Sequence, residues 1–508
     1  MPATDQTRLQ RLSKPIAALL FLLAAMALAA GAAKGGGNYI LLLSATLAAG
    51  YLALTIGAND AANNIGAAVG AGAITLGGAL AVAAAGELAG GFLASSAVSD
   101  RLREGIFQPL GFGDGMELAR VLFGGMLAAA IWLHLATFLR IPISATHSVI
   151  GGLIGAGVFA RGWEVVQWEQ IGWFAVAWVL APILAAGIAA VTLRAIYQLV
   201  LTRPNLTGAA RTHMPALVTL LALVLTHHFF LRIAPDEWYL TQHHLLVSLI
   251  VALAVFLIAQ PWVHRTTQTI KNNRQGVSRL FTLPLILAAG FFAFSHGAND
   301  TANVAAPLAV IAEIASEGNS PPRLALPTWA VAVGVFGIVT GLLLYGSRIV
   351  RTVGSEITEI DRPRAFSIMF SSAVVIVIAS LLGYPVSTTH TVVGSIFGIG
   401  LLREILKLEQ GKTLEKIRKC HEQCDDDRLD AFLQRFRGAT LPKKKRMLKA
   451  LFQEHGAVHL DNEERRNIHQ RYHRELLRRP LLRRIVIAWI LTIPAAGLLG
   501  GIVFHLSG

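Results

Sequence analysis

Long apolar stretches alternate with short polar connections along most of this 508-residue chain. A helix needs about 20 apolar residues to cross a bilayer, and stretches of that order recur throughout. Some are short or interrupted, so the pattern predicts an all-α polytopic membrane protein with about 10–12 membrane elements. The apolar stretches cover residues 15–33, 38–56, 121–139, 171–191, 215–231, 245–263, 283–295, 328–345, 365–382 and 485–504.

Composition and charge agree with a lipid bilayer as the surroundings. Of all residues, 54% are hydrophobic and 15% are charged, whereas soluble proteins have about 25% charged residues. The net charge of +14 raises the question of nucleic acid binding, but the basic residues flank apolar stretches, which is typical of cytoplasmic loops. Residues 403–479 alone hold 20 Lys and Arg against 13 Asp and Glu. We therefore expect no nucleic acid partner, and a cytoplasmic N-terminus and 403–482 segment in a cell (inner or plasma) membrane protein.

Two different motifs each occur twice, in the same order. Residues 57–63 read GANDAAN and residues 297–303 read GANDTAN, with six of seven positions identical. Residues 142–157 (PISATHSVIGGLIGAG) and 385–400 (PVSTTHTVVGSIFGIG) agree at eight of sixteen positions. The offsets, 240 and 243 residues, are nearly equal, so the chain is a duplicated unit. Such repeats are typical of secondary transporters, whose sites lie at the interface between the repeats.

The repeats divide the chain into six segments. Each motif places Gly, Pro, Asn, Asp, Ser or Thr inside an apolar stretch, and irregular backbone at that depth must face protein or water rather than lipid. We therefore expect broken or re-entrant helices at all four motifs, two in each repeat. The segments are 1–37, an N-terminal segment with an uncleaved first transmembrane helix; 38–200, the first transport repeat; 201–280, connecting helices and a basic loop; 281–402, the second repeat; 403–482, a basic cytoplasmic segment; and 483–508, a final transmembrane helix.

The Asn and Asp residues of the first motif pair are candidate cation ligands. A carboxylate at membrane depth is costly and by default indicates a functional site. Carboxylate and amide oxygens are the ligands of hard cations such as Na⁺. Asn and Asp also cap helix N-termini well, but capping alone does not explain two copies at membrane depth. The residues are Asn59, Asp60, Asn63, Asn299, Asp300 and Asn303.

The second motif pair has the character of an anion site. Each cluster of hydroxyl residues follows a proline and opens an apolar helix, where backbone N–H groups are unpaired and the helix dipole is positive. Capping by the same hydroxyls is compatible with anion binding. His147 and His390 either orient these turns or relay a proton. The hydroxyl residues are Ser144, Thr146, Ser387, Thr388 and Thr389.

The four motifs contain no Lys or Arg. A buried anion would therefore need compensation from co-bound cations, because burying an uncompensated charge is prohibitively costly. This predicts coupled entry of anion and cations. Glu87, in the apolar sequence AAAGELAGG, is a further candidate for the coupling, and the 240-residue offset places Pro327 opposite it in the second repeat.

These motifs resemble the Pit family of inorganic phosphate transporters. The matching sequences are GANDAANNIGAAVGAGAITL, HGANDTANVAAPLAV, PISATHSVIGG and PVSTTHTVVGS, and the similarity covers about residues 38–402 and the final helix. It implies phosphate import by symport with Na⁺ or H⁺, without another cofactor, through two repeats of inverted topology, and often a homodimer. Carried over by position, the substrate ligands would be Asn59, Asp60, Asn63, Ser144, Thr146, Asn299, Asp300, Asn303, Ser387, Thr388 and Thr389, and the cation-coupling residues Asp60, Asp300, Asn59, Asn299 and Glu87.

Two departures from a symmetric family pattern matter. Ala145 stands where the second repeat has Thr388, so the halves cannot bind a substrate identically. Met369 is apolar where some relatives have an acidic side chain nearby, which leaves the stoichiometry open. Because some relatives carry sulfate, the motifs identify a tetrahedral anion more firmly than phosphate, and a sulfate permease is an alternative.

Three other functions receive less support from the sequence. An anion channel would share the repeats but lack coupling. An enzyme using Asp60, Ser144 and His147 as a triad would not need the constellation twice, so we expect no catalysis. Cys420, Cys424, His469 and His473 have spacings that suit zinc, but coincidence on amphipathic helices is favoured and no metal is expected.

Overall fold

The structure, a computed structural model, describes residues 3–33, 38–108, 111–112, 114–139, 141–232, 243–317, 326–356, 360–421, 435 and 479–507. The chain forms two units, Met1–Gly398 with Arg479–Gly508, and Ile399–Arg478. In the second unit the described part is the end of a helix that reaches His421, and the zinc spacing involving Cys424, His469 and His473 lies outside the described residues.

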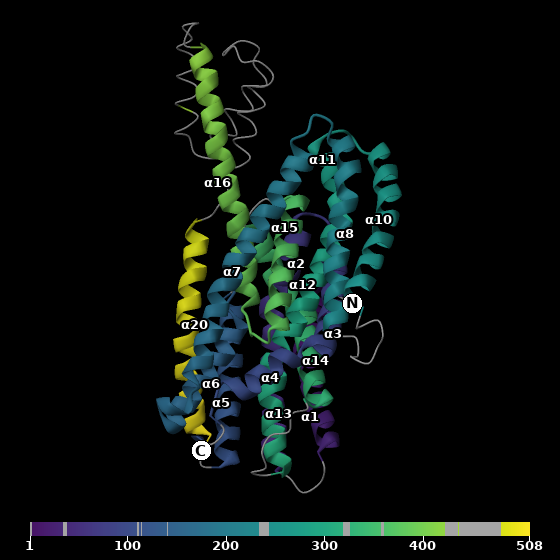
Figure 1. Cartoon of the computed structure of the whole chain (residues 1–508). Coiled ribbons are helices and arrows are strands. Elements are labelled where there is room, and N and C mark those ends of the chain that lie inside the picture. The colour runs from purple at the N-terminus through teal and green to yellow at the C-terminus, as the bar shows by residue number, and fades with distance from the viewer. Residues whose placement is uncertain are drawn as a thin grey trace. The chain divides into compact units, whose positions relative to one another are not determined.

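Regular structure in the described residues is helical (Figure 1) apart from one isolated bridge between Phe107 and Val166. The α-helices are α1 (Ala3–Ala32), α2 (Tyr39–Gly70), α3 (Leu76–Ala94), α4 (Ser96–Gly105), α5 (Gly115–Phe138), α6 (Ala145–Arg161), α7 (Trp168–Ile196), α8 (Leu206–Arg232), α10 (His244–Thr269), α11 (Arg274–Ser278), α12 (Thr282–Asp300), α13 (Ala302–Glu317), α14 (Thr328–Glu356), α15 (Arg362–Leu381), α16 (Thr388–His421) and α20 (Arg479–Leu506).

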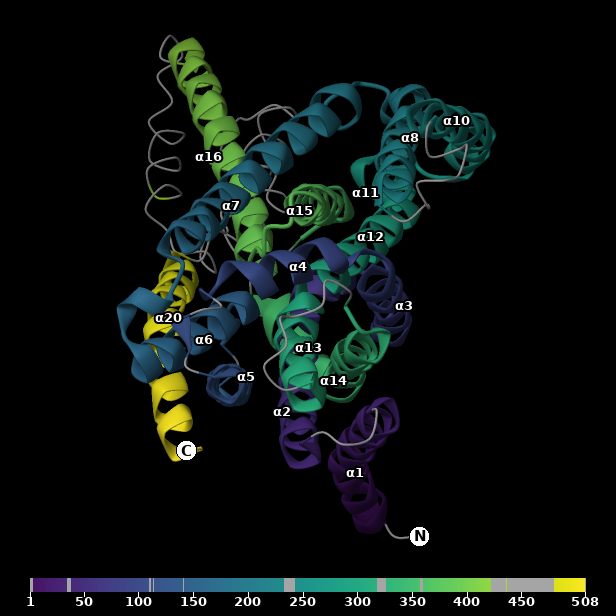
Figure 2. The ribbon, with the colours of Figure 1, turned by 60° about the horizontal axis from the view of Figure 1, so that its bottom comes forward.

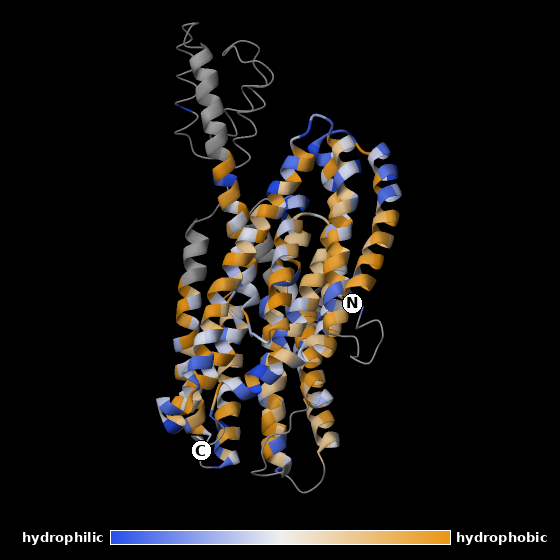
Figure 3. Cartoon of the chain, viewed as in Figure 1, coloured by the Kyte–Doolittle hydropathy of each residue, from blue (hydrophilic) through white to orange (hydrophobic). Residues whose placement is uncertain are grey.

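Eleven candidate membrane spans lie among the described residues, which confirms the expected all-α membrane protein with 10–12 elements. The span missing from the apolar stretches above is α3, which is rich in Gly and Ala and contains Glu87. Hydrophobic residues make up much of the helices in the first unit (Figure 3). Leu180 on α7 and Leu253 on α10, for example, are exposed, as expected of surfaces that contact lipid.

The helix breaks differ from expectation at one motif. The second motif pair forms hairpin turns, between α5 and α6 and between α15 and α16, and Thr301 separates α12 from α13. However, α2 runs without interruption through Gly57–Asn63, so the predicted break there is wrong. An unbroken helix satisfies its backbone N–H and C=O groups through i→i−4 hydrogen bonds, so the polar side chains of the motif do not by themselves require a break.

Helices of one half pack against helices of the other half in two equivalent pairs, α2 with α14 and α12 with α3. Gly57 on α2 lies against the carbonyl oxygen of Ile338 on α14, and Gly297 on α12 lies against that of Glu87 on α3; a Cβ at either glycine would clash. The glycines are 240 residues apart and their partners 251. The structural counterpart of Glu87 is therefore Ile338, not Pro327, which corrects the simple offset.

The final helix takes part in the same scheme. On α6, Gly151 lies against the Ile493 carbonyl of α20, and on α16, Gly394 lies against the Pro182 carbonyl of α7. The glycines are 243 residues apart and their partners 311. Helix α20 is thus the counterpart of α7, and the larger offset reflects the 403–482 segment that precedes it.

The two hairpins enter from opposite ends of the first unit. Figure 1 shows α5 and α6 in the lower half and α15 in the upper half, so that their turns meet inside the bundle. Helix α4 crosses the bundle beside α13 (Figure 2). Its Arg101 donates to the Leu382 carbonyl at 3.3 Å and lies 5.0 Å from the centre of the Tyr384 ring. Helix α4 therefore holds the turn of the second hairpin.

Candidate functional site

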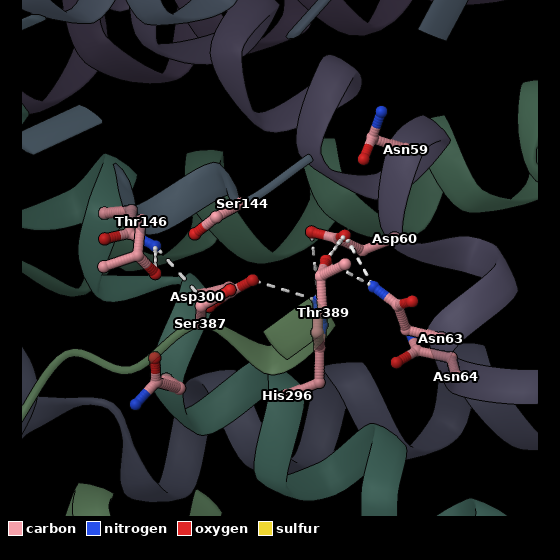
Figure 4. Close-up of polar contacts among 12 residues, drawn as sticks. Asn59, Asp60, Asn63, Asn64, Ser144, Thr146, His296, Asp300, Ser387 and Thr389 are labelled. Carbon is pink, nitrogen blue, oxygen red and sulfur yellow. Dashed lines mark hydrogen bonds and ion pairs between the residues drawn. The ribbon is translucent and has the colours of Figure 1, made fainter. Parts of the chain in front are cut away.

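Asn59 fixes the turn of the first hairpin to α2. Its Nδ2 atom donates to Thr137 Oγ1 at 3.1 Å and to the Ile141 carbonyl at 3.4 Å. Its Oδ1 atom accepts from the Ile143 backbone N–H at 3.3 Å. Both donors of the amide are used inside the protein, and in Figure 4 the Asn59 side chain lies apart from the group formed by Asp60, Asn63 and Thr389.

Asn299 does the same for the second hairpin. Its Nδ2 atom donates to Ser380 Oγ at 3.1 Å and to the Tyr384 carbonyl at 3.3 Å, and its Oδ1 atom accepts from the Val386 N–H at 3.3 Å. These partners stand 243 residues after those of Asn59. One hydrogen-bonding device thus occurs twice, and in both copies the asparagine positions the turn that carries the Ser/Thr cluster.

Serine side chains cap the two helices that begin at these turns. Ser144 Oγ accepts from the His147 N–H at 3.1 Å, and Ser387 Oγ accepts from the His390 N–H at 3.2 Å. Both serines are buried. The two serines therefore do cap these helices, as expected. Each serine accepts from one backbone N–H, which leaves the other N–H groups of the first turn available for an anion.

Threonines join the two hairpin turns to each other. Thr146 Oγ1 donates to the Val386 carbonyl at 3.1 Å, and Thr389 Oγ1 donates to the Ile143 carbonyl at 3.2 Å. The N-termini of α6 and α16 consequently lie side by side. Two positive helix ends with buried hydroxyls form a suitable environment for an oxyanion.

Asp60 and Asn63 of the first half reach across to Thr389. Asn63 Nδ2 donates to Asp60 Oδ1 and to Thr389 Oγ1, both at 2.8 Å, and Thr389 Oγ1 lies 3.1 Å from Asp60 Oδ1. In the equivalent set, Asn303 Nδ2 lies 3.5 Å from Asp300 Oδ1 and 3.3 Å from Thr146 Oγ1. Each aspartate is thus held beside the hairpin of the other half.

His296 stands between the two aspartates (Figure 4) and was not a candidate from the sequence. Its Nε2 atom lies 3.0 Å from Asp300 Oδ2 and 3.6 Å from Asp60 Oδ2. Its Nδ1 atom lies 2.6 Å from Glu87 Oε1, which also accepts from Asn64 Nδ2 at 2.5 Å. All five side chains are buried. The structure thereby places Glu87 in the site and adds His296 and Asn64 to it.

The Glu87 side of this network occurs in one half only. By the repeat offsets, His296 corresponds to Ile56 and Asn64 to Val304, just as Glu87 corresponds to Ile338. Three polar residues of this network therefore have apolar residues at the equivalent positions of the other half. A comparison of the two halves in the sequence, at the offset of each helix, would have revealed these exceptions.

The acidic cluster has the donor set of a cation site. Asp60, His296 and Asp300 offer ligand atoms within 4.8 Å of one another, all buried. Buried acceptors of this cluster without a hydrogen-bond partner in the described part of the chain include Asn64 Oδ1, Asn303 Oδ1 and Glu87 Oε2. Oxygen-rich surroundings of this kind favour hard cations such as Na⁺. Thr388, which has no hydroxyl counterpart in the first half, is buried.

A cavity of about 240 Å³ approaches the site between α4, α5, α6 and α13. Among its lining residues, Val149 lies three residues beyond Thr146 on α6, and Ala306 lies three residues beyond Asn303 on α13. Three helical residues, a rise of about 4.5 Å, therefore separate these two lining positions from the Thr146–Asn303 contact. Arg103 of α4 also lines the cavity.

The comparisons with known proteins agree with one another. A profile described as the phosphate transporter family matches residues 56–500. A Helicobacter pylori protein named as a phosphate permease is 36% identical over 502 residues, 97% of this chain and 94% of that protein. Inorganic phosphate transporter 2-1, chloroplastic, of Arabidopsis thaliana is 32% identical over 72% of this chain and 66% of its own. A solved structure entitled "The sodium-dependent phosphate transporter" matches with a TM-score of 0.74 and 26% identity, covering 92% of this chain and 99% of the other.

Proposed function

The chain belongs to the phosphate transporter family, and on that premise we propose that it imports inorganic phosphate by symport with Na⁺ or H⁺ through the site where its two hairpins meet. It is a multi-pass membrane protein. The observation that carries the mechanism is the joining of the α6 and α16 N-termini beside three buried carboxylates and one imidazole.

The anion would occupy the side of the site formed by the two helix starts. Ser144, Thr146, Ser387, Thr388 and Thr389 supply hydroxyls there, and the first-turn N–H groups supply further donors. Asn63 and Asn303 lie at the boundary with the acidic cluster, since each contacts an aspartate and a threonine. Asn59 and Asn299 act in this scheme as positioning residues for the two turns, because their amide donors are already used.

The cations would occupy the acidic side, at Asp60, Asp300 and Glu87. A phosphate dianion that moves into a negative interior of 100 mV faces about 4.6 kcal/mol, at about 2.3 kcal/mol per charge. Two monovalent cations cancel this cost and a third drives uptake. Coupling follows because neither the anion nor the cations that compensate its charge enter a low-dielectric site without the other.

The site favours phosphate over sulfate in this account. Asp60 and Asp300 present buried acceptors at the junction of the anion and cation regions. A phosphate hydroxyl can donate to such an acceptor and sulfate cannot, so sulfate would leave it unpaired.

We expect uptake of radiolabelled phosphate into proteoliposomes under an inward Na⁺ or H⁺ gradient. Unlabelled sulfate should compete at least about a hundredfold more weakly than unlabelled phosphate, because of the unpaired acceptor. Liposomes without protein are the control. Equal competition would contradict the proposed discrimination against sulfate, and uptake of labelled sulfate without uptake of labelled phosphate would reject phosphate as the substrate and favour the sulfate permease. Anion flux that depends on neither gradient would favour a channel.

The topology is part of the proposal. In this proposal the N-terminus and residues 403–482 lie in the cytoplasm and the protein lies in the inner or plasma membrane, which the basic residues beside the apolar stretches support. The opposed hairpins support inverted repeats, since α5–α6 and α15 enter from opposite ends (Figure 1). Assembly as a homodimer belongs to the same expectation from the family.

A further inference from the structure

Two tryptophans on equivalent helices flank the hairpin turns. Trp178 on α7 and Trp489 on α20 are 311 residues apart, the offset that relates Pro182 to Ile493 at the matching contacts with α16 and α6. Each ring contacts the histidine of its own half: Trp178 and His147 have ring centres 4.2 Å apart, and Trp489 and His390 have ring centres 3.7 Å apart. The two tryptophans are therefore structural counterparts.

Their indole N–H groups differ. Trp178 Nε1 donates to the Pro385 carbonyl at 2.9 Å, at the start of the other half's Ser/Thr cluster. The equivalent acceptor for Trp489 is the Pro142 carbonyl, 243 residues before Pro385. In the described part of the chain, Trp489 Nε1 is buried and has no hydrogen-bond partner. A buried indole N–H normally finds an acceptor, so its lack of one is unfavourable in this conformation.

The contacts of the two aspartate sets differ in the same sense. Around Asp60, the hydrogen bonds of Asn63 are both 2.8 Å long, whereas around Asp300 those of Asn303 are 3.5 and 3.3 Å. The cavity lies on the side of the longer contacts, three residues beyond Asn303. The hydrogen bond from Trp178 to Pro385 therefore occurs together with the longer contacts of Asn303 and with a cavity on the Thr146–Asn303 side.

We propose that Trp178 and Trp489 are positioning residues that hold the two hairpin turns alternately. In the conformation described here, Trp178 is bonded to Pro385 and Trp489 is released. In the conformation open to the other side of the membrane, Trp489 Nε1 donates to the Pro142 carbonyl and Trp178 releases Pro385. Each half then adopts the local contacts that its counterpart has here. The inference rests on the proposed transport function for its purpose, but its test does not require transport.

The test measures accessibility of the cavity. A single cysteine replaces Leu118, which lines the cavity, in a chain whose two natural cysteines, Cys420 and Cys424, are changed to serine. A membrane-impermeant thiol reagent then reports how often the cavity is open. Trp178→Phe should lower the labelling rate and Trp489→Phe should raise it, because each removes a donor needed by one conformation only. Loss of one hydrogen bond corresponds to about a fivefold change in the ratio of the two conformations.

Trp173→Phe is the matched control, because Trp173 lies on α7 and is exposed, and it should leave the rate unchanged. The double variant Trp178→Phe/Trp489→Phe should return towards the original rate. Changes in the same direction for both single variants, or none, would overturn the proposal. If Trp178→Phe does not fold, Trp489→Phe alone decides, since it removes no hydrogen bond from the conformation described here. Phosphate uptake measured in parallel separates failure of this proposal from failure of the transport function.

Discussion

Replacing Asp60 by asparagine is expected to lower gradient-driven phosphate uptake by about a hundredfold or more, and Asp300→Asn should have the same effect. Both carboxylates are buried and face Nε2 of His296. Asparagine keeps the size of the side chain but removes its charge. Removing one partner from a buried ion pair costs about 3–5 kcal/mol, and each 1.4 kcal/mol corresponds to about a factor of ten. In addition, the proposed cation site loses part of its charge.

Asp361→Asn is the matched control, because Asp361 caps α15 from a more exposed position. Uptake by this variant should be close to that of the unchanged protein. Substantial uptake by both Asp60→Asn and Asp300→Asn, measured with equal amounts of folded protein, would mean that the acidic cluster does not bind the coupling cations.

The second large effect is expected at Glu87. Glu87→Gln should raise the cation concentration needed for half-maximal uptake by at least about tenfold, because a unit charge within several ångströms of a buried cation contributes more than about 1.4 kcal/mol. Glutamine keeps the size of the side chain and an oxygen that can still accept from Asn64 Nδ2, so the geometry should persist. The measurement is initial phosphate uptake as a function of cation concentration, with phosphate saturating.

Glu169→Gln provides the comparison, since Glu169 is exposed at the start of α7. An unchanged cation dependence in Glu87→Gln, with normal maximal uptake, would assign Glu87 a structural role only. Loss of maximal uptake at every cation concentration would instead indicate that the charge of Glu87 is needed for phosphate itself.

The sequence predicted the class of fold and the family, and both are confirmed. It also singled out residues that the fold brings together, such as Asp60 and Thr389, although they are 329 positions apart. This was possible because duplication repeats a costly pattern, and an ionisable side chain at membrane depth usually serves a function. The ligand roles of these residues stay predictions.

Other features depended on partners that a local pattern does not reveal. His296 directly precedes GANDTAN, the second copy of the Asn/Asp motif, but its place in the acidic cluster depends on its contact with Glu87 on a different helix. Asn59 and Asn299, the first asparagine of each copy of the motif, look like ligands in the sequence. In the structure, however, Asn59 holds a turn through Thr137 and Ile143. The composition of the motif does not decide whether the helix is interrupted either, because α2 runs unbroken through GANDAAN whereas Thr301 interrupts the nearly identical GANDTAN.

The most direct test of the account follows phosphate and the cation in the same proteoliposomes, with radiolabelled phosphate and either labelled Na⁺ or a lumenal pH indicator. The account predicts that the coupling cation enters only when phosphate is present outside, that phosphate accumulates only when the cation gradient is present, and that Asp60→Asn abolishes both fluxes together. Phosphate entry at full rate without any cation movement, or cation movement that is indifferent to phosphate, would contradict it.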